Sequence, residues 1–265
     1  MGKITDIFAS KRLRFFAVSA FLAGLLVLLS SYTTDNILAQ FVALFLPPIF
    51  AIFLTYLTLE RPGGIEIVTL LLLPAILVAG ASLNQYFFPN LHLVFKLGSW
   101  LSFFSIFYLL LLSLNIFRVE RVKKESIPLE KVAKPAIFLF SFLAMFLLLT
   151  VLYKLALGVV FSTLVVFLIS FVLSLNFFWF LTLSNLFERR FFLGAAVVAG
   201  GLAQVSLAFS FFPWESFLRA LSEGVFFYSM LGIARAYYER HLRYRIVIEY
   251  IIVALAVFLF TRVFS

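Results

Sequence analysis

Nine apolar stretches occupy nearly all of the 265 residues of the chain. Most are roughly twenty residues long, which is what a helix needs to cross a hydrocarbon core of about 30 Å. Hydrophobic residues make up 64% of the chain, charged residues only 12%, and the mean hydropathy is +1.14. This leaves too little polar surface to cover a water-soluble globule. The sequence predicts spans at Phe15–Tyr32, Ile37–Leu59, Gly64–Leu83, Ser99–Phe117, Pro135–Tyr153, Leu157–Phe187, Phe191–Phe212, Leu221–Tyr238 and Ile246–Arg262.

The length of these stretches also decides the fold class. Backbone polar groups in lipid must be satisfied within the protein, so only helices and closed barrels span a membrane. The stretches are too long and too uniformly apolar for barrel strands. We therefore expect an all-α, polytopic transmembrane helical bundle of about nine spans (eight to ten), forming a single integral membrane domain over residues 1–265.

The distribution of basic residues predicts the orientation. With nine spans, 17 of the 21 lysines and arginines fall on the side of the N-terminus. Cytoplasmic loops carry the excess of basic residues, so we expect a cytoplasmic N-terminus. The stretch 157–187 would be about 46 Å long as one helix, and it can also be read as two spans. Two spans would move Arg189, Arg190 and the basic run 240–245 outside, so the charges favour one span. The compartment we expect is the cytoplasmic (inner) membrane of a prokaryote.

One connection is long and basic. Residues 118–134 contain six basic and three acidic residues, and we expect a cytoplasmic loop that divides four spans from five. The loop is interpreted either as a solvated linker or as a surface that binds anionic lipid headgroups or a partner. The basic residues lie in such connections, so the net charge of +9 does not indicate nucleic-acid binding.

Signs of metal or catalytic chemistry are missing from the sequence. The chain has no cysteine, and its two histidines, His92 and His241, are far apart. It also contains no HExxH motif, no aspartate-rich motif and no glycine-rich phosphate loop. We therefore expect no metal, no cofactor and no catalytic residue, although membrane enzymes can assemble sites from distant spans.

Three predicted spans contain helix-breaking residues near their centres. Proline removes a backbone hydrogen bond, which lipid tolerates only where protein or a cavity covers the gap. Such breaks are found at the binding sites of carriers, but they are also consistent with a kink and close packing. The candidate substrate or helix-break positions are Pro47, Pro48, Pro74, Gly200, Gly201 and Gln204.

The seventh span also carries small residues four apart, such as Ala195 and Ala199. This spacing lets helix backbones approach closely. It predicts a buried packing face or, as the alternative, a substrate groove in which Gln204 is the only obvious polar partner. A helix-mediated oligomer is a further expectation.

The charged residues nearest to the spans are expected close to the membrane surfaces. Glu66, Glu223 and Glu249 each lie about one turn from a predicted span end, from where they can reach the interface. Arg243, Arg245 and Glu249 form a candidate headgroup cluster, because an acid beside several cations at the inner leaflet can hold a lipid phosphate. Arg245 and Glu249 are four residues apart and can pair on one helix face.

Three hypotheses for the function remain open. A carrier or permease-like protein for a small molecule or lipid predicts that the helix breaks converge on one cavity. A membrane enzyme for lipid-linked phosphates predicts a polar cleft lined by Glu249, Arg243 and Arg245. An accessory or scaffolding protein predicts a solid bundle without a cavity. The carrier is the hypothesis we favour, with the lipid bilayer and anionic headgroups as partners.

Overall fold

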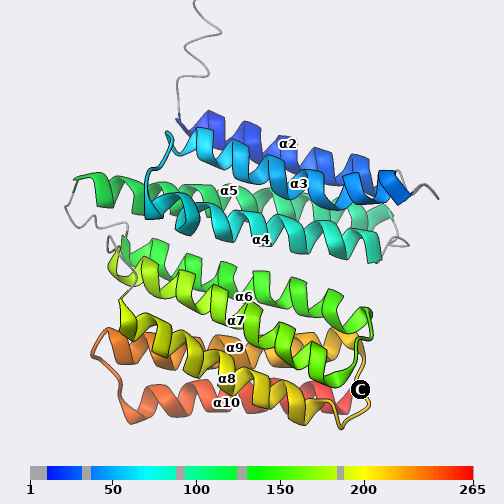
Figure 1. The fold of residues 1–265 in the computed structure, drawn as a ribbon, viewed down its shortest axis with the longest axis vertical. Coiled ribbons are helices and arrows are strands. Elements are labelled where there is room, and N and C mark those ends of the chain that lie inside the picture. Colours follow the sequence, from blue (N-terminus) through cyan, green and yellow to red (C-terminus); the bar gives the residue numbers. More distant parts are fainter. Residues whose placement is uncertain (1–10, 32–36, 88–92, 124–129, 184–187, 265) are drawn as a thin grey trace, which may run out of the picture. The chain divides into compact units, whose positions relative to one another are not determined.

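The computed structural model describes residues 11–31, 37–87, 93–123, 130–183 and 188–264. Within these ranges the chain forms nine α-helices (Figure 1). The shortest has 20 residues, which corresponds to about 30 Å at 1.5 Å per residue. The helices are α2 (Lys11–Ser31), α3 (Ile37–Thr58), α4 (Ile65–Phe87), α5 (Leu93–Lys123), α6 (Glu130–Lys154), α7 (Val159–Thr182), α8 (Arg189–Phe209), α9 (Ser216–Tyr238) and α10 (Tyr244–Val263).

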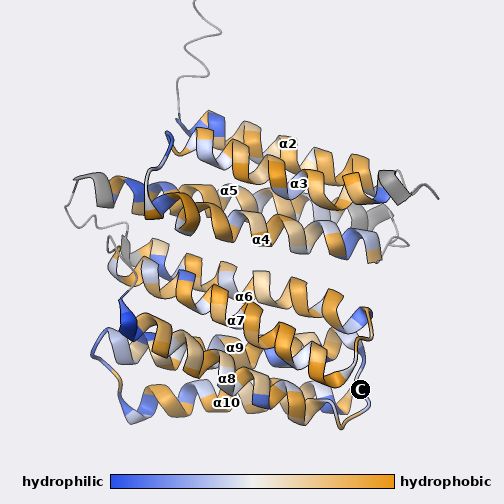
Figure 2. Cartoon of the chain, in the orientation of Figure 1, coloured by the Kyte–Doolittle hydropathy of each residue, from blue (hydrophilic) through white to orange (hydrophobic). Residues whose placement is uncertain are grey.

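All nine helices are long and apolar enough to cross a membrane. Apolar residues follow the helices along their length, whereas polar residues gather near helix ends and in connections (Figure 2). Large apolar side chains face outward, among them Val160, Val197 and Phe211, as suits a lipid environment. The prediction of an all-α, multi-pass membrane protein is confirmed, while its orientation in the membrane stays a prediction.

The ambiguous stretch 157–187 contains one helix. α7 begins after Gly158 and has 24 residues, which is about 36 Å. It ends at Thr182. The next residue, Leu183, has a left-handed conformation with φ 49° and donates its N–H to the carbonyl of Trp179. The single span is thus confirmed, but the expected length of about 46 Å is wrong because Leu183 stops the helix. Residues 184–187 lie outside the described ranges.

The predicted loop 118–134 is shorter than expected. α5 continues to Lys123 and α6 begins at Glu130, so helix extends into both ends of this segment. Residues 124–129 lie outside the described ranges. Whether this connection binds headgroups stays a prediction.

The chain divides into two compact units, residues 1–137 and 138–265. In the first unit α3 packs on α4, and α2 packs on α3 and α5. Its core contains fully buried Leu22, Leu73, Leu77 and Phe107. Burial of such side chains supplies the packing energy of the unit.

Two ion pairs connect elements of the first unit. Arg118 of α5 pairs with Glu66 of α4, and both side chains are largely buried. Lys11 pairs with Glu60 over 2.7 Å at an exposed position. The hydrogen bond from Lys11 holds the pKa of Glu60 below its usual value, assisted by the charges of Lys11, Arg14 and Arg118 and opposed by slight burial.

In the second unit α8 packs on α7 and α9, and α10 packs on α9. Aromatic rings join α6 to α9: the centroids of Phe138 and Tyr228 are 4.3 Å apart. Ala195 and Ala199 of α8 are fully buried. The small residues predicted to form a packing face are therefore buried at these two positions, as close helix contact requires.

Candidate functional site

Arginines collect at one end of the second unit, where α8 begins, α9 ends and α10 begins. Six arginines lie there together with three glutamates and His241. We call this the arginine-rich end. Its arginines are Arg189, Arg190, Arg235, Arg240, Arg243 and Arg245.

A groove runs between α8 and α9 and reaches this end. Its volume is about 910 Å³, within the range of ligand sites. Apolar residues of both helices, such as Val197 and Met230, line its length. Arg190 and Arg240 line it at the arginine-rich end. The groove therefore combines a long apolar wall with cationic groups at one end.

Two glycines of α8 shape the wall of this groove. A Cβ at Gly194 would overlap the hydroxyl of Tyr238, and a Cβ at Gly201 would lie 3.2 Å from the sulfur of Met230. The Tyr238 hydroxyl donates a hydrogen bond to the carbonyl of Arg190. Glycine at these positions lets α9 side chains lie against the α8 backbone.

The role of Gly194 can be tested against Gly200, which has nothing within 4 Å of a Cβ position. Gly194→Ala is expected to destabilise the protein by about 1–3 kcal/mol through overpacking, since Tyr238 is held by Arg190 and by the ring of Phe178. Gly200→Ala should be neutral or stabilising by about 0.5–1 kcal/mol. Thermal unfolding in detergent measures both changes. Equal shifts for the two variants would contradict this account of the groove wall.

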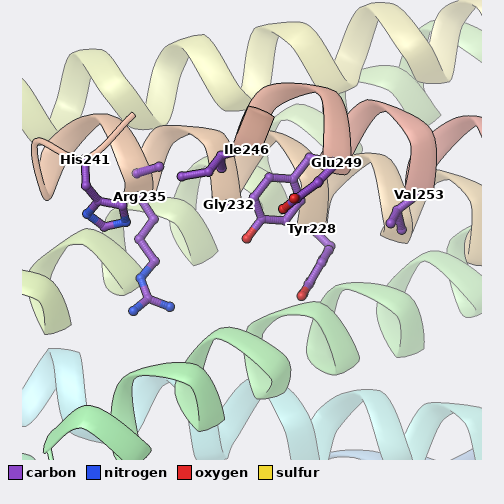
Figure 3. A pocket seen from close by; sticks show the side chains of 9 residues that line it. Tyr228, Gly232, Arg235, His241, Ile246, Glu249 and Val253 are labelled. Atoms are coloured by element: carbon purple, nitrogen blue, oxygen red, sulfur yellow. The ribbon is translucent and has the colours of Figure 1, made fainter. Parts of the chain in front are cut away.

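A second, more polar pocket lies between α9 and α10. It has a volume of about 480 Å³, and Tyr228, Arg235, His241, Glu249 and Tyr250 are among its lining residues. Figure 3 shows His241 and Arg235 at one end of the pocket, Val253 at the other, and Tyr228 and Glu249 between them. Arg235 pairs with Glu239 over 3.1 Å. The two cavities thus flank α9 near the arginine-rich end.

The predicted headgroup cluster is only partly assembled. Arg245 pairs with Glu249 over 3.0 Å, as its spacing predicts, and both side chains are exposed. Arg243 precedes α10 as its N-cap residue and is also exposed. Only Glu249 of the three lines the described pocket. A headgroup role for this cluster stays a prediction.

The predicted helix breaks do not end helices. α3 continues through Pro47 and Pro48, and α4 continues through Pro74. Leu44, whose carbonyl lies four residues before Pro48, lines a cavity of about 20 Å³, which is room for about one water molecule.

The glycine pair also lies within a continuous helix. α8 continues through Gly200 and Gly201. Gly201 lines the groove, while Gln204 is exposed. Because the prolines and these α8 residues lie in different units, their convergence on one cavity stays a prediction.

Two carboxylates are more buried than their spacing suggested. Glu223 was expected to reach the outer interface, but it is fully buried, and this expectation is wrong. α9 begins at Ser216 and not at Leu221, so Glu223 lies seven residues, about two turns, inside the helix. Glu66 is 5% exposed and likewise faces the interior of its unit.

Glu223 belongs to a hydrogen-bonded network of residues from three helices, α6, α8 and α9. The Arg219 Nε donates to its Oε1 over 3.0 Å, and the Tyr153 hydroxyl donates to its Oε2. The Ser206 hydroxyl lies 3.0 Å from that of Tyr153. The i,i+4 spacing of Arg219 and Glu223 was the available signal for their pairing. Tyr153 and Ser206 had no signal, because their approach depends on how α6 and α8 pack.

Gly201 was a predicted candidate position and lines the groove, whereas the two arginines that line it were missed. Arg190 and Arg240 were read only as orientation signals, yet both line it. Their separation of 50 residues along the chain hides this proximity, which arises from the packing of α8 on α9.

Comparison with known proteins gives a family and no activity. No curated protein matches the chain, and no solved structure matches it. A family model described as "Protein of unknown function (DUF5656)" matches residues 55–264. The match begins in α3 and includes the groove, the pocket and the Glu223 network. The chain, a multi-pass membrane protein, therefore belongs to the DUF5656 family.

Proposed function

We propose that the protein is a lipid carrier that binds an anionic phospholipid in the groove between α8 and α9. An acyl chain lies along the apolar wall, and the phosphate lies between Arg190 and Arg240. The observation that carries this proposal is the combination of a groove of about 910 Å³ with two arginines at one end. The charge division of the sequence supports placing this end at the cytoplasmic face of a prokaryotic inner membrane.

The charges around the groove complement a phosphate. The arginine-rich end has six arginines against three glutamates, and each basic group near an anionic lipid surface contributes about 1 kcal/mol. Arg190 pairs with Glu188 over 2.6 Å, but both side chains are about half exposed. Exposed pairs contribute little, so Arg190 is free to exchange this partner for a phosphate oxygen.

The other two functions, a scaffolding protein and a membrane enzyme, agree less well with the cavities of the second unit. A scaffolding protein predicts a solid bundle, whereas the second unit holds cavities of about 910 and 480 Å³. An enzyme for lipid-linked phosphates predicts a cleft lined by Arg243, Arg245 and Glu249, of which Glu249 alone lines the described pocket. These observations favour a carrier, and the carrier predicts selective lipid binding.

Lipid binding is tested with charge-matched variants. Arg190→Gln with Arg240→Gln removes both groove arginines. Arg189→Gln with Arg245→Gln removes two arginines of the same end that do not line the groove. At about 1.5 kcal/mol for each hydrogen bond between an arginine and the charged phosphate, the groove variant should bind phosphatidylglycerol roughly a hundredfold more weakly. The control variant should change little. Native mass spectrometry with phosphatidylglycerol and phosphatidylcholine measures the retained lipid.

The outcome separates a specific site from general charge attraction. Equal losses in the two double variants would show that the lipid responds only to net charge and would contradict the groove site. Transfer of fluorescent phosphatidylglycerol between leaflets of proteoliposomes tests the carrier role. The unchanged protein should accelerate transfer more than the groove variant does.

A further inference from the structure

A separate cavity lies at the other end of α9, remote from the arginine-rich end. Its volume is about 130 Å³, and Tyr153, Ser162, Ser210, Ser216 and Arg219 are among its lining residues. It has room for several water molecules. A small carboxylate such as acetate has a comparable size. The cavity lining includes three serine side chains and the guanidinium of Arg219.

Arg219 is held rigidly at the wall of this cavity. Its Nη2 donates to the Ser206 carbonyl over 2.8 Å and to the Ser210 hydroxyl over 2.9 Å. Its guanidinium carbon lies 4.0 Å from the centre of the Tyr153 ring. Its Nε donates a hydrogen bond to the Oε1 of Glu223. Nη1 has no acceptor among the residues that the structure describes, which leaves two of the five N–H groups of this arginine for a ligand.

Glu223 lies behind Arg219 and is closed to solvent. The titratable or charged groups that face it are Tyr153 from α6 and Arg219 from α9. α8 contributes the hydroxyl of Ser206, which lies beside that of Tyr153. One cation therefore balances one buried anion. A second anion at Arg219 would leave an uncompensated negative charge, which is costly inside a membrane protein.

We propose that this cavity binds a small carboxylate at Arg219 and that Glu223 takes up one proton as the carboxylate binds. The proton comes from solution and forms an O–H bond on Glu223, which keeps the cluster neutral. Protonated Glu223 donates to the hydroxyl oxygen of Tyr153, and Tyr153 then donates to Ser206. The carboxylate itself is bound unchanged, with no bond formed or broken in it. This site is independent of the lipid groove.

The test measures acetate binding to the full-length protein in detergent at a series of pH values. Trp214 also lines the cavity, so tryptophan fluorescence follows binding, with sodium chloride at equal ionic strength as the control. Acetate affinity is expected to rise about tenfold for each unit that the pH falls. Calorimetry in buffers of different ionisation enthalpy should count one proton taken up for each acetate.

Three variants separate the parts of the proposal. Glu223→Gln keeps the side-chain size, and acetate should then bind without pH dependence or proton uptake. Ser216→Phe fills the cavity and should abolish binding. Val160→Phe adds the same ring at an exposed position of α7 and should change nothing.

Several results would overturn the proposal. These are no saturable acetate binding to the folded protein, pH dependence that persists in Glu223→Gln, or binding that survives in Ser216→Phe. Thermal unfolding establishes that each variant is folded. If Glu223→Gln does not fold, the proton count on the unchanged protein decides.

Discussion

Glu223→Ala is expected to lower the free energy of unfolding by about 3–5 kcal/mol, the cost of leaving one partner of a buried ion pair uncompensated. Arg219 would keep its charge at a position where its side chain is only 15% exposed, and Tyr153 would lose its acceptor. The double variant Arg219→Ala with Glu223→Ala should lose less free energy of unfolding than the sum of the losses in the two single variants, because neither charge then remains without its partner. Unfolding in detergent measures all three variants.

The second unit contains its own controls for this effect. Arg235–Glu239 and Arg245–Glu249 have the same spacing and N···O distances of 3.1 and 3.0 Å. The Arg245 and Glu249 side chains are 89% and 61% exposed, so Glu249→Ala should cost about 0.5 kcal/mol or less. Glu239→Ala should lower the free energy of unfolding by an amount between those of Glu223→Ala and Glu249→Ala. An equal cost at all three positions would contradict burial as the cause.

Arg118→Ala is expected to have an effect of similar size in the first unit, about 3–5 kcal/mol. Its partner Glu66 has a side chain only 7% exposed and would lose the guanidinium that balances its charge. The pair joins α4 to α5, so its loss also removes a contact between helices. The measurement is thermal or denaturant unfolding of the purified protein.

Lys11→Ala is the matched control in the same unit. Its pair with Glu60 has side-chain exposures of 42% and 53%, and exposed pairs contribute about 0–1 kcal/mol. The Arg118 variant should therefore be the less stable of the two by a wide margin. Similar stabilities would show that the Arg118–Glu66 pair is well solvated in the protein.

The helices were predictable because each apolar run matches the thickness of a bilayer. Even α7 was assigned as one span from the charges around it. Helix ends were less predictable: α9 begins five residues before the expected Leu221. Ser216 and Arg219 are polar residues inside this helix, so hydropathy alone placed its start too late. For that reason the sequence placed Glu223 too close to the end of the helix.

Contacts between helices could not be predicted from the sequence. A helix that is apolar on all sides has no amphipathic face to show which side meets a neighbour. Glu66 and Arg118 are 52 residues apart, and Tyr153 and Glu223 are 70 apart. Only pairs on one helix, such as Arg245 and Glu249, could be predicted from spacing. The groove arginines Arg190 and Arg240 were missed for the same physical reason.

Site-specific photo-crosslinking tests the lipid groove most directly. Val197 and Val160 are both exposed valines, but Val197 lines the groove and Val160 lies on α7 outside it. A photoreactive residue is placed at each position in nanodiscs that contain phosphatidylglycerol and phosphatidylcholine. A lipid bound in the groove predicts enrichment of phosphatidylglycerol adducts at position 197 over position 160, and loss of this enrichment when Arg190 and Arg240 are replaced by glutamine. Equal adduct composition at both positions would contradict it.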